Sequence, residues 1–236
     1  MTIISIHQPG YIPWLGFFDK IFSCEKFVFL DDVQFQKNEF QNRNKIRVFD
    51  GDMWLTVPVK SKSDTLLYDV KIDNTSNWIK KHIKSIELNY SNSEFFNEYW
   101  PEFELIFRKK YDNLINLNID IIKFLLEKLK IKTETIFSSE LNISDKNSDR
   151  ILKICKALKA DTYISGISGK NYLNIEDFKK NGINIIFQKF QHPIYHQVFE
   201  PFHLNMSTID LLFNEGGRAS EIIKNNNNFS RVVDKN

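Results

Sequence analysis

The sequence predicts an α/β protein with a Rossmann-like, largely parallel sheet, to which a β-hairpin and a helical middle segment are added. Short β-branched and apolar runs occur in both halves of the chain and are typical of buried strands. They alternate with segments that have apolar residues every three or four positions, which is typical of helices and predicts parallel βαβ units. For 236 residues we expect a single domain over 1–224, with a helical insertion at about 76–130 and a loose tail at 225–236.

The first sixty residues predict the opening of a parallel sheet. Residues 2–6 are apolar and β-branched and predict a buried strand that ends at His7. A loop follows, then a short amphipathic helix from Trp14 to about Ser23, and a second strand at 27–30 that ends in Asp31–Asp32. Strand, loop, helix and strand in this order begin an α/β unit.

The middle and the end of the chain continue this pattern. KIRVF and MWLTVPV flank Asp50-Gly51-Asp52, which predicts a hairpin. Ser207 is expected to cap the last helix, which runs to Asn214 and stops at Gly216–Gly217. The other expected elements are helices at 76–90, about 94–110, 113–130 and 146–159, and strands at 136–137, 162–165 and 183–187.

Composition excludes several classes of protein. With 42% hydrophobic residues the chain can bury a normal core. Its net charge of +2 comes from 32 basic and 30 acidic residues without a concentrated basic patch, so no nucleic-acid partner is expected. Cys24 and Cys155 lie far apart and fit a reducing compartment. With no signal peptide or long apolar run, we expect a cytoplasmic protein without membrane insertion.

Polar residues follow the first two predicted strands, where ligands of parallel sheets bind. His7 is suited to general acid–base work, although it could instead be a structural histidine that closes the strand. Asp31 and Asp32 could bind an ammonium, a hydroxyl or a magnesium ion, or they could cap a polar turn. Arg43 could hold a phosphate or carboxylate.

Two later segments are also candidates. Around Ser168 and Tyr172, small residues after a strand would let a ligand approach the backbone, or they form an ordinary turn. His192 and His196 are four residues apart, which suits zinc only on a helix, and Pro193 argues against a helix there. No metal site is therefore expected, and Gln197 is assigned to a loop that shapes the substrate site.

Several stretches resemble the WbqC-like proteins: IHQPGYIPWLGFFDKI, FVFLDDVQFQKNEFQNRNKI, WLTVPVK, KKHIKSIELNY, ADTYISG, SGKNYL, FQHPIYHQ and STIDLLFNEG. This resemblance spans Ile3 to about Gly216 in the expected order. Such proteins are typically encoded in bacterial surface-polysaccharide clusters, including O-antigen clusters, some of which make amino sugars that carry glycine or another amino acid. The resemblance therefore implies acyl or aminoacyl transfer onto the amine of a nucleotide-linked deoxyamino sugar.

For this reaction we expect His7 to act as the base, oriented by Asp31 or Asp32. The expected substrate-binding residues are Gln8, Tyr11, Trp14, Gln34, Gln41, Asn42, Arg43, Lys45, Ser168, Tyr172 and Gln197. If the donor is a thioester on an acyl or aminoacyl carrier protein, no cofactor is required, whereas an ATP-activated donor would bring ATP and magnesium.

Two alternatives to acyl transfer remain open. A nucleotidyltransferase-like or ATP-dependent ligase activity fits a histidine at the end of the first strand. The HxGH pair of nucleotidyltransferases is absent, however, because Gln-Pro-Gly follows His7. The other alternative is a non-catalytic module that binds a carrier protein.

Overall fold

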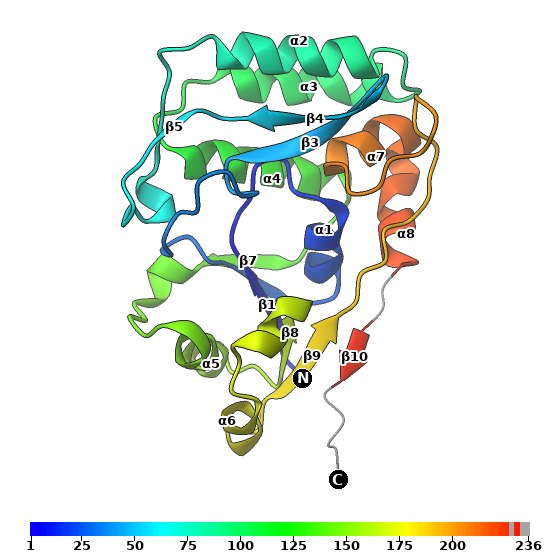
Figure 1. The fold of residues 1–236 in the computed structure, drawn as a ribbon. Helices are drawn as coiled ribbons and strands as arrows, with labels where there is room; N and C mark the ends of the chain where they lie inside the picture. The colour runs from blue at the N-terminus through cyan, green and yellow to red at the C-terminus, as the bar shows by residue number, and fades with distance from the viewer. Residues whose placement is uncertain (227–228, 232–236) are drawn as a thin grey trace.

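The central sheet is largely parallel and belongs to the Rossmann type (Figure 1). The computed structural model describes residues 1–226 and 229–231, and within them the sheet has six strands in the order β10-β9-β8-β1-β2-β7. Five adjacent strands run parallel, namely β9, β8, β1, β2 and β7, and β10 pairs antiparallel with β9. The strands are β1 (Ile3–His7), β2 (Lys26–Phe29), β7 (Glu134–Phe137), β8 (Thr162–Ser165), β9 (Asn184–Gln188) and β10 (Phe229–Arg231).

The strand order determines where a ligand can bind. From β1 the chain first builds the sheet outward through β2 and β7, and then returns to the other side of β1 with β8 and β9. In an open α/β sheet the connections leave on opposite sides of such a reversal, so that a crevice forms beyond the carboxyl ends of the two strands. Here that switch point lies between β1 and β8, and His7 is the last residue of β1.

Helices cover both faces of the sheet (Figure 1). On one face, α5 (Asn147–Ala157) and α6 (Ile175–Lys180) pack against apolar side chains of β1, β8 and β9. The opposite face is covered by α1 (Leu15–Phe22) and α8 (Ala219–Lys224), which contact each other. The α/β class and the parallel sheet predicted from the sequence are confirmed.

The long connection between β2 and β7 forms a second layer above the carboxyl ends of the strands (Figure 1). It contains the predicted hairpin and the helices expected at about 76–130, whose apolar residues at three- and four-residue spacing are buried in the main core. Its elements are β3 (Arg43–Val48), β4 (Gly51–Thr56), β5 (Val59–Lys60), η1 (Leu67–Asp69), β6 (Lys71–Ile72), α2 (Trp78–Tyr90), α3 (Phe96–Arg108) and α4 (Leu114–Lys128).

The end of the chain differs from expectation in detail. Helix α7 (Thr208–Glu215) begins after Ser207, but the serine hydroxyl is buried and makes no capping hydrogen bond with any described residue. The helix stops at Gly216, where φ is +53° and a side chain would collide with Phe95. Of the tail expected to be loose, 229–231 form β10, whereas 227–228 and 232–236 lie outside the described residues.

The remaining short elements are η2 (Ser138–Leu141), η3 (Ile167–Asn171) and η4 (Gly216–Arg218). Within the described ranges, no helix has both the length and the apolar character that crossing a membrane requires.

Candidate functional site

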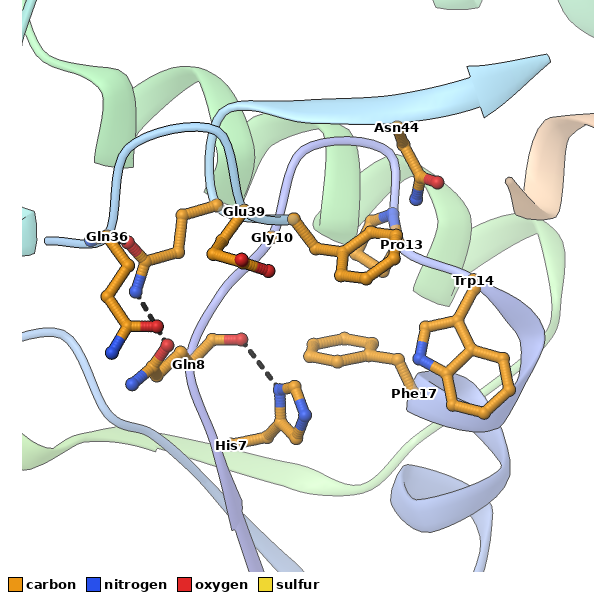
Figure 2. Close-up of a pocket in the computed structure, with 11 residues that line it drawn as sticks. His7, Gln8, Gly10, Pro13, Trp14, Phe17, Gln36, Glu39 and Asn44 are labelled. Carbon is orange, nitrogen blue, oxygen red and sulfur yellow. Dashed lines mark hydrogen bonds between the residues drawn. The ribbon is translucent and has the colours of Figure 1, made fainter. Parts of the chain in front are cut away.

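A cavity of about 190 Å³ lies beyond the carboxyl end of β1 (Figure 2). Two loops, residues 8–14 and 36–42, form most of its wall together with Asn44 of β3, and we call these two loops the pocket loops. The floor is formed by the end of β1 and the first turn of α1. The lining residues are His7, Gln8, Gly10, Pro13, Trp14, Phe17, Gln36, Glu39, Phe40, Gln41 and Asn44.

His7 presents one defined nitrogen to this cavity. Its Nδ1 lies 2.8 Å from the backbone oxygen of Gln8, and since a carbonyl only accepts, Nδ1 must carry the proton. The neutral ring therefore has its lone pair on Nε2, for which no described residue provides a hydrogen bond. The Phe17 ring contacts His7 edge-on at 5.4 Å and fixes the orientation of the imidazole.

The surroundings of His7 lower its pKa. The residue is exposed toward the cavity, although the protein surrounds its ring on the other sides. Desolvation, aided by the positive charge of Lys20, lowers the pKa of His7 to about 3. The imidazole is therefore neutral at pH 7, with Nε2 unprotonated.

A buried charged pair lies on α1 behind His7. Burial lowers the pKa of Lys20 to about 7, although electrostatic interactions with Cys24 and Asp19 act to raise it. Burial also raises the pKa of Asp19 to about 6. The Gln188 amide donates hydrogen bonds to the Asp19 carboxylate and, at 2.9 Å, to the Gly16 carbonyl. The Lys20 ammonium lies 4.0 Å from where a Cβ of Gly166 would stand, at the β1/β8 switch point.

Hydrogen bonds join the two pocket loops to each other. The Gln41 side chain donates to that of Gln8 at 2.6 Å, and the Tyr11 amide donates to the Phe40 carbonyl at 2.9 Å. Gly10 is required here, because a Cβ would stand 2.8 Å from the same Phe40 oxygen. The loops are therefore held at a fixed separation.

Asn118 of α4 ties both loops to the core. Its fully buried side chain donates to the Gln41 carbonyl at 2.8 Å and lies 3.4 Å from the Pro9 carbonyl. Asn44 of β3, directly after the second loop, makes a similar bond, since its amide donates to the Ile12 carbonyl at 2.7 Å. These two asparagines satisfy backbone carbonyls that the protein hides from water.

A carboxylate and an aromatic side chain complete the lining of the cavity. Figure 2 shows the Glu39 carboxylate directed into it, above Gln8 and His7. On the opposite side the Trp14 indole forms the wall and lies over Gly16, where a Cβ would come within 2.3 Å of the ring. The site thus combines a neutral base, a carboxylate, several amides and aromatic walls, which can hold and deprotonate an amine or a hydroxyl.

Of the residues proposed from the sequence, His7, Gln8, Trp14 and Gln41 line this cavity. Asp31 and Asp32 do not, and among the described residues neither carboxylate contacts His7. The Asp31 carboxylate accepts hydrogen bonds from the Ser138 hydroxyl at 3.0 Å and from the Ser139 hydroxyl at 2.7 Å. Asp32 pairs with Arg150. The expectation that either aspartate orients His7 is corrected, because the Gln8 carbonyl does so.

Tyr11, Asn42 and Gln197 are buried in structural hydrogen bonds. The Tyr11 hydroxyl is 2.7 Å from His82 Nδ1, and the Asn42 amide donates to the Val57 carbonyl at 3.0 Å. Gln197 donates to the buried Asp210 carboxylate at 2.8 Å and ties down its own loop. These side chains support the scaffold and do not line the cavity.

The other candidates lie on the surface outside the cavity. Gln34 donates to the Ser63 carbonyl in a neighbouring loop. Arg43 and Lys45 belong to the outer face of β3, and Ser168 and Tyr172 are exposed on or just after η3.

The cavity also contains residues that were not proposed. The lining residues missed are Gly10, Pro13, Phe17, Gln36, Glu39, Phe40 and Asn44. Lys20 was missed as well, although the sequence carried a signal, since LGFFDKIF is apolar around the whole helix and so places its charged pair in the core. No comparable pattern distinguishes Glu39 from an ordinary loop carboxylate.

The segment around His192 and His196 is not helical, as expected, and His192 Nδ1 lies 2.9 Å from the Pro193 carbonyl. Across the described part of the chain, no group of three histidine, cysteine or carboxylate side chains is arranged to hold a metal ion.

Comparison with known proteins matches the chain to one protein family. The model of the WbqC-like protein family matches residues 8–222. The chain is also similar to the uncharacterized protein Rv1507c of Mycobacterium tuberculosis, with 31% identity over 228 residues that cover 95% of this chain and 98% of the relative. No solved structure matches the chain significantly.

Replacing Asn118 with alanine should leave buried carbonyls of both pocket loops without a donor. We expect the free energy of unfolding to fall by about 1–3 kcal/mol in urea titrations. Asn116→Ala is the matched control, because Asn116 is exposed on the same helix. Equal stability of the two variants would contradict the role assigned to Asn118.

Replacing Lys20 with methionine should change how stability depends on pH. Between pH 7 and 8 the unfolded chain keeps this lysine protonated, whereas the folded protein, with a pKa of about 7, loses the proton. The unfolded state then binds more protons, so the free energy of unfolding should rise with pH, by up to about 1.4 kcal/mol per unit.

In Lys20→Met this rise should disappear, whereas Lys81→Met, at an exposed position, should retain it. Urea titrations at pH 7, 7.5 and 8 measure both slopes, below the range in which the unfolded chain deprotonates Cys24 and Cys155, whose pKa values the fold raises to about 12. The window lies above the range in which the histidines with lowered pKa values titrate. An unchanged slope in Lys20→Met would show that the lysine is not buried as described.

Proposed function

The chain belongs to the WbqC-like protein family, and we propose that it is an enzyme that transfers an acyl or aminoacyl group to the amine of a nucleotide-linked deoxyamino sugar in surface-polysaccharide biosynthesis. The observation that carries this proposal is the state of His7. Its Nδ1 proton is committed to the Gln8 carbonyl, and its unprotonated Nε2 is free to accept a proton at the cavity. An amine nucleophile needs such a base.

The reaction can be written with these residues in named roles. Glu39 would hold the acceptor nitrogen, which arrives as an ammonium, releases one proton to solvent water and then attacks as a neutral amine. As the new C–N bond forms, His7 Nε2 would accept a second proton from the nitrogen. At and below pH 7, where at least half of the molecules keep Lys20 protonated, its charge behind the site would favour the negative oxygen of the tetrahedral intermediate. When the C–S or C–O bond to the leaving group breaks, His7 would return the proton to that group.

The size of the cavity supports a small acceptor group. Pockets for complete drug-sized ligands usually measure about 300–1,000 Å³. At about 190 Å³, this cavity suits one sugar ring and its amine, with the rest of the ligand outside. The aromatic side chains of Trp14, Phe17 and Phe40 offer the apolar faces against which sugar rings pack.

The donor determines whether a cofactor is required. A thioester of an acyl or aminoacyl carrier protein would need none, because its carbonyl is already activated. An amino acid activated by ATP would instead bring ATP and magnesium to the site.

A second candidate is nucleotidyl transfer or ATP-dependent ligation, favoured by the strand order and by Lys20. The β1/β8 switch point is where Rossmann-type sheets bind nucleotides, and the Lys20 ammonium lies beside Gly166 there. Release of pyrophosphate from ATP in the presence of an acceptor would establish this activity. Turnover of a thioester without ATP would exclude it as the main reaction.

His7→Ala should lower turnover at least about 100-fold, because the base is removed while the cavity stays intact. Mass spectrometry of the amide formed from a panel of acyl thioesters and nucleotide-linked amino sugars measures this. His196→Ala is the control, since that histidine is exposed and does not line the cavity. Full activity of His7→Ala would refute the assignment of the base.

Glu39→Gln should remove the preference for an amine over a hydroxyl in the acceptor. In thermal-shift experiments, a nucleotide-linked amino sugar at about a hundred times its dissociation constant should stabilise the wild type by about 2.7 kcal/mol, and its hydroxyl counterpart by less. The variant should respond equally to both, whereas Glu94→Gln, exposed on another loop, should behave as wild type. A preference that survives in Glu39→Gln would exclude the carboxylate as the ammonium ligand.

A further inference from the structure

An exposed aromatic surface begins at the rim of the cavity. Phe40 lines the cavity, yet 52% of its surface is exposed, and its ring lies 5.8 Å from that of Trp54 on β4. Trp54 is itself 37% exposed. Single exposed aromatic residues are ordinary, but two in contact that continue a cavity form a surface on which a planar group can stack.

Cationic side chains flank this aromatic surface. The Arg43 guanidinium lies 4.3 Å from the centre of the Trp54 ring, and the Lys45 ammonium lies 5.3 Å from it. Lys45 and Trp54 are opposite each other in the hairpin, and Arg43 is two residues before Lys45, so all three project from the same outer face.

The two cations differ in what neutralises them. Lys45 forms an ion pair with Asp52 at 2.9 Å. For the Arg43 side chain no described residue acts as a hydrogen-bond acceptor, and its Nε is buried without a partner. A guanidinium held by stacking on an indole, with its donors unpaired, is suited to an anion with several oxygens, such as a phosphate.

We propose that Phe40, Trp54 and Arg43 bind the nucleoside diphosphate part of a ligand whose sugar occupies the cavity. The base would stack on the exposed rings, and the diphosphate would lie by Arg43, between the base and the sugar. The identity of the sugar rests on the proposed function, whereas the nucleoside diphosphate site rests on the hairpin surface itself. The small size of the cavity agrees, since a complete sugar nucleotide must extend beyond it.

The test is calorimetric titration of the whole protein with UDP, dTDP and ADP, none of which carries an amine or a sugar to be modified. We expect saturable binding of at least one of them. Trp54→Ala and Arg43→Ala should each weaken it by about tenfold or more. Trp54→Phe, which keeps a ring, should retain most of the affinity.

A control lies on the same hairpin. Phe49→Ala removes an aromatic side chain that is 77% exposed at the hairpin turn. This variant should bind as wild type. Binding of the free nucleoside should no longer distinguish Arg43→Ala from wild type, because the diphosphate is missing. Melting curves check that each variant is folded.

Absence of saturable binding for all three diphosphates, or unchanged affinity in both Trp54→Ala and Arg43→Ala, would overturn the proposal. Its failure is distinguishable from that of acyl transfer. Turnover of an amino sugar that carries no nucleotide would retain the proposed chemistry and reject this site. Diphosphate binding that depends on Trp54, without any His7-dependent transfer, would retain this site and reject the proposed chemistry.

Discussion

The candidate site depends on the hydrogen bonds that hold the two pocket loops together. One loop leaves β1 and the other precedes β3, so neither belongs to a regular element that would position it. Their backbone carbonyls are hidden from water and need donors, which Asn118, Asn44 and the Tyr11 amide supply. These bonds hold the two loops around the cavity at the end of β1.

The core extends this constraint through α4 and α1. Apolar residues bury α4 in the main core, so Asn118 reaches the loops from a rigid helix. Helix α1 is buried on all sides, which forces Asp19 and Lys20 into the interior and costs stability that packing must offset. Desolvation, with the Lys20 charge as a smaller cause, keeps the His7 ring neutral. Packing thus determines the electrostatics of the site.

Periodicity predicted the fold well because burial of strands and helices leaves a direct pattern in the chain. It also placed His7 at a strand end, where the cavity is found. It failed for Asp31 and Asp32, whose partners Ser138, Ser139 and Arg150 come from segments far away in the sequence. Local sequence does not reveal which polar residues will find such partners.

Residues of the cavity were also missed because local sequence does not reveal which distant segments meet in the fold. Glu39 and Phe40 lie in a polar stretch without periodicity, and only the approach of the first loop makes them part of a cavity. Arg43 was expected at the site for its charge, and it lies instead beside Trp54, because strand alternation directs it to the outer face of the hairpin.

Gly10 has a consequence for the variety of ligands that related proteins can accept. Since a Cβ at this position would meet the Phe40 carbonyl at 2.8 Å, the glycine sets how closely the loops approach. A relative with any larger residue here must hold its loops further apart, and its cavity must be wider. This single position can therefore sort the family into narrow and wide pockets before any member is assayed.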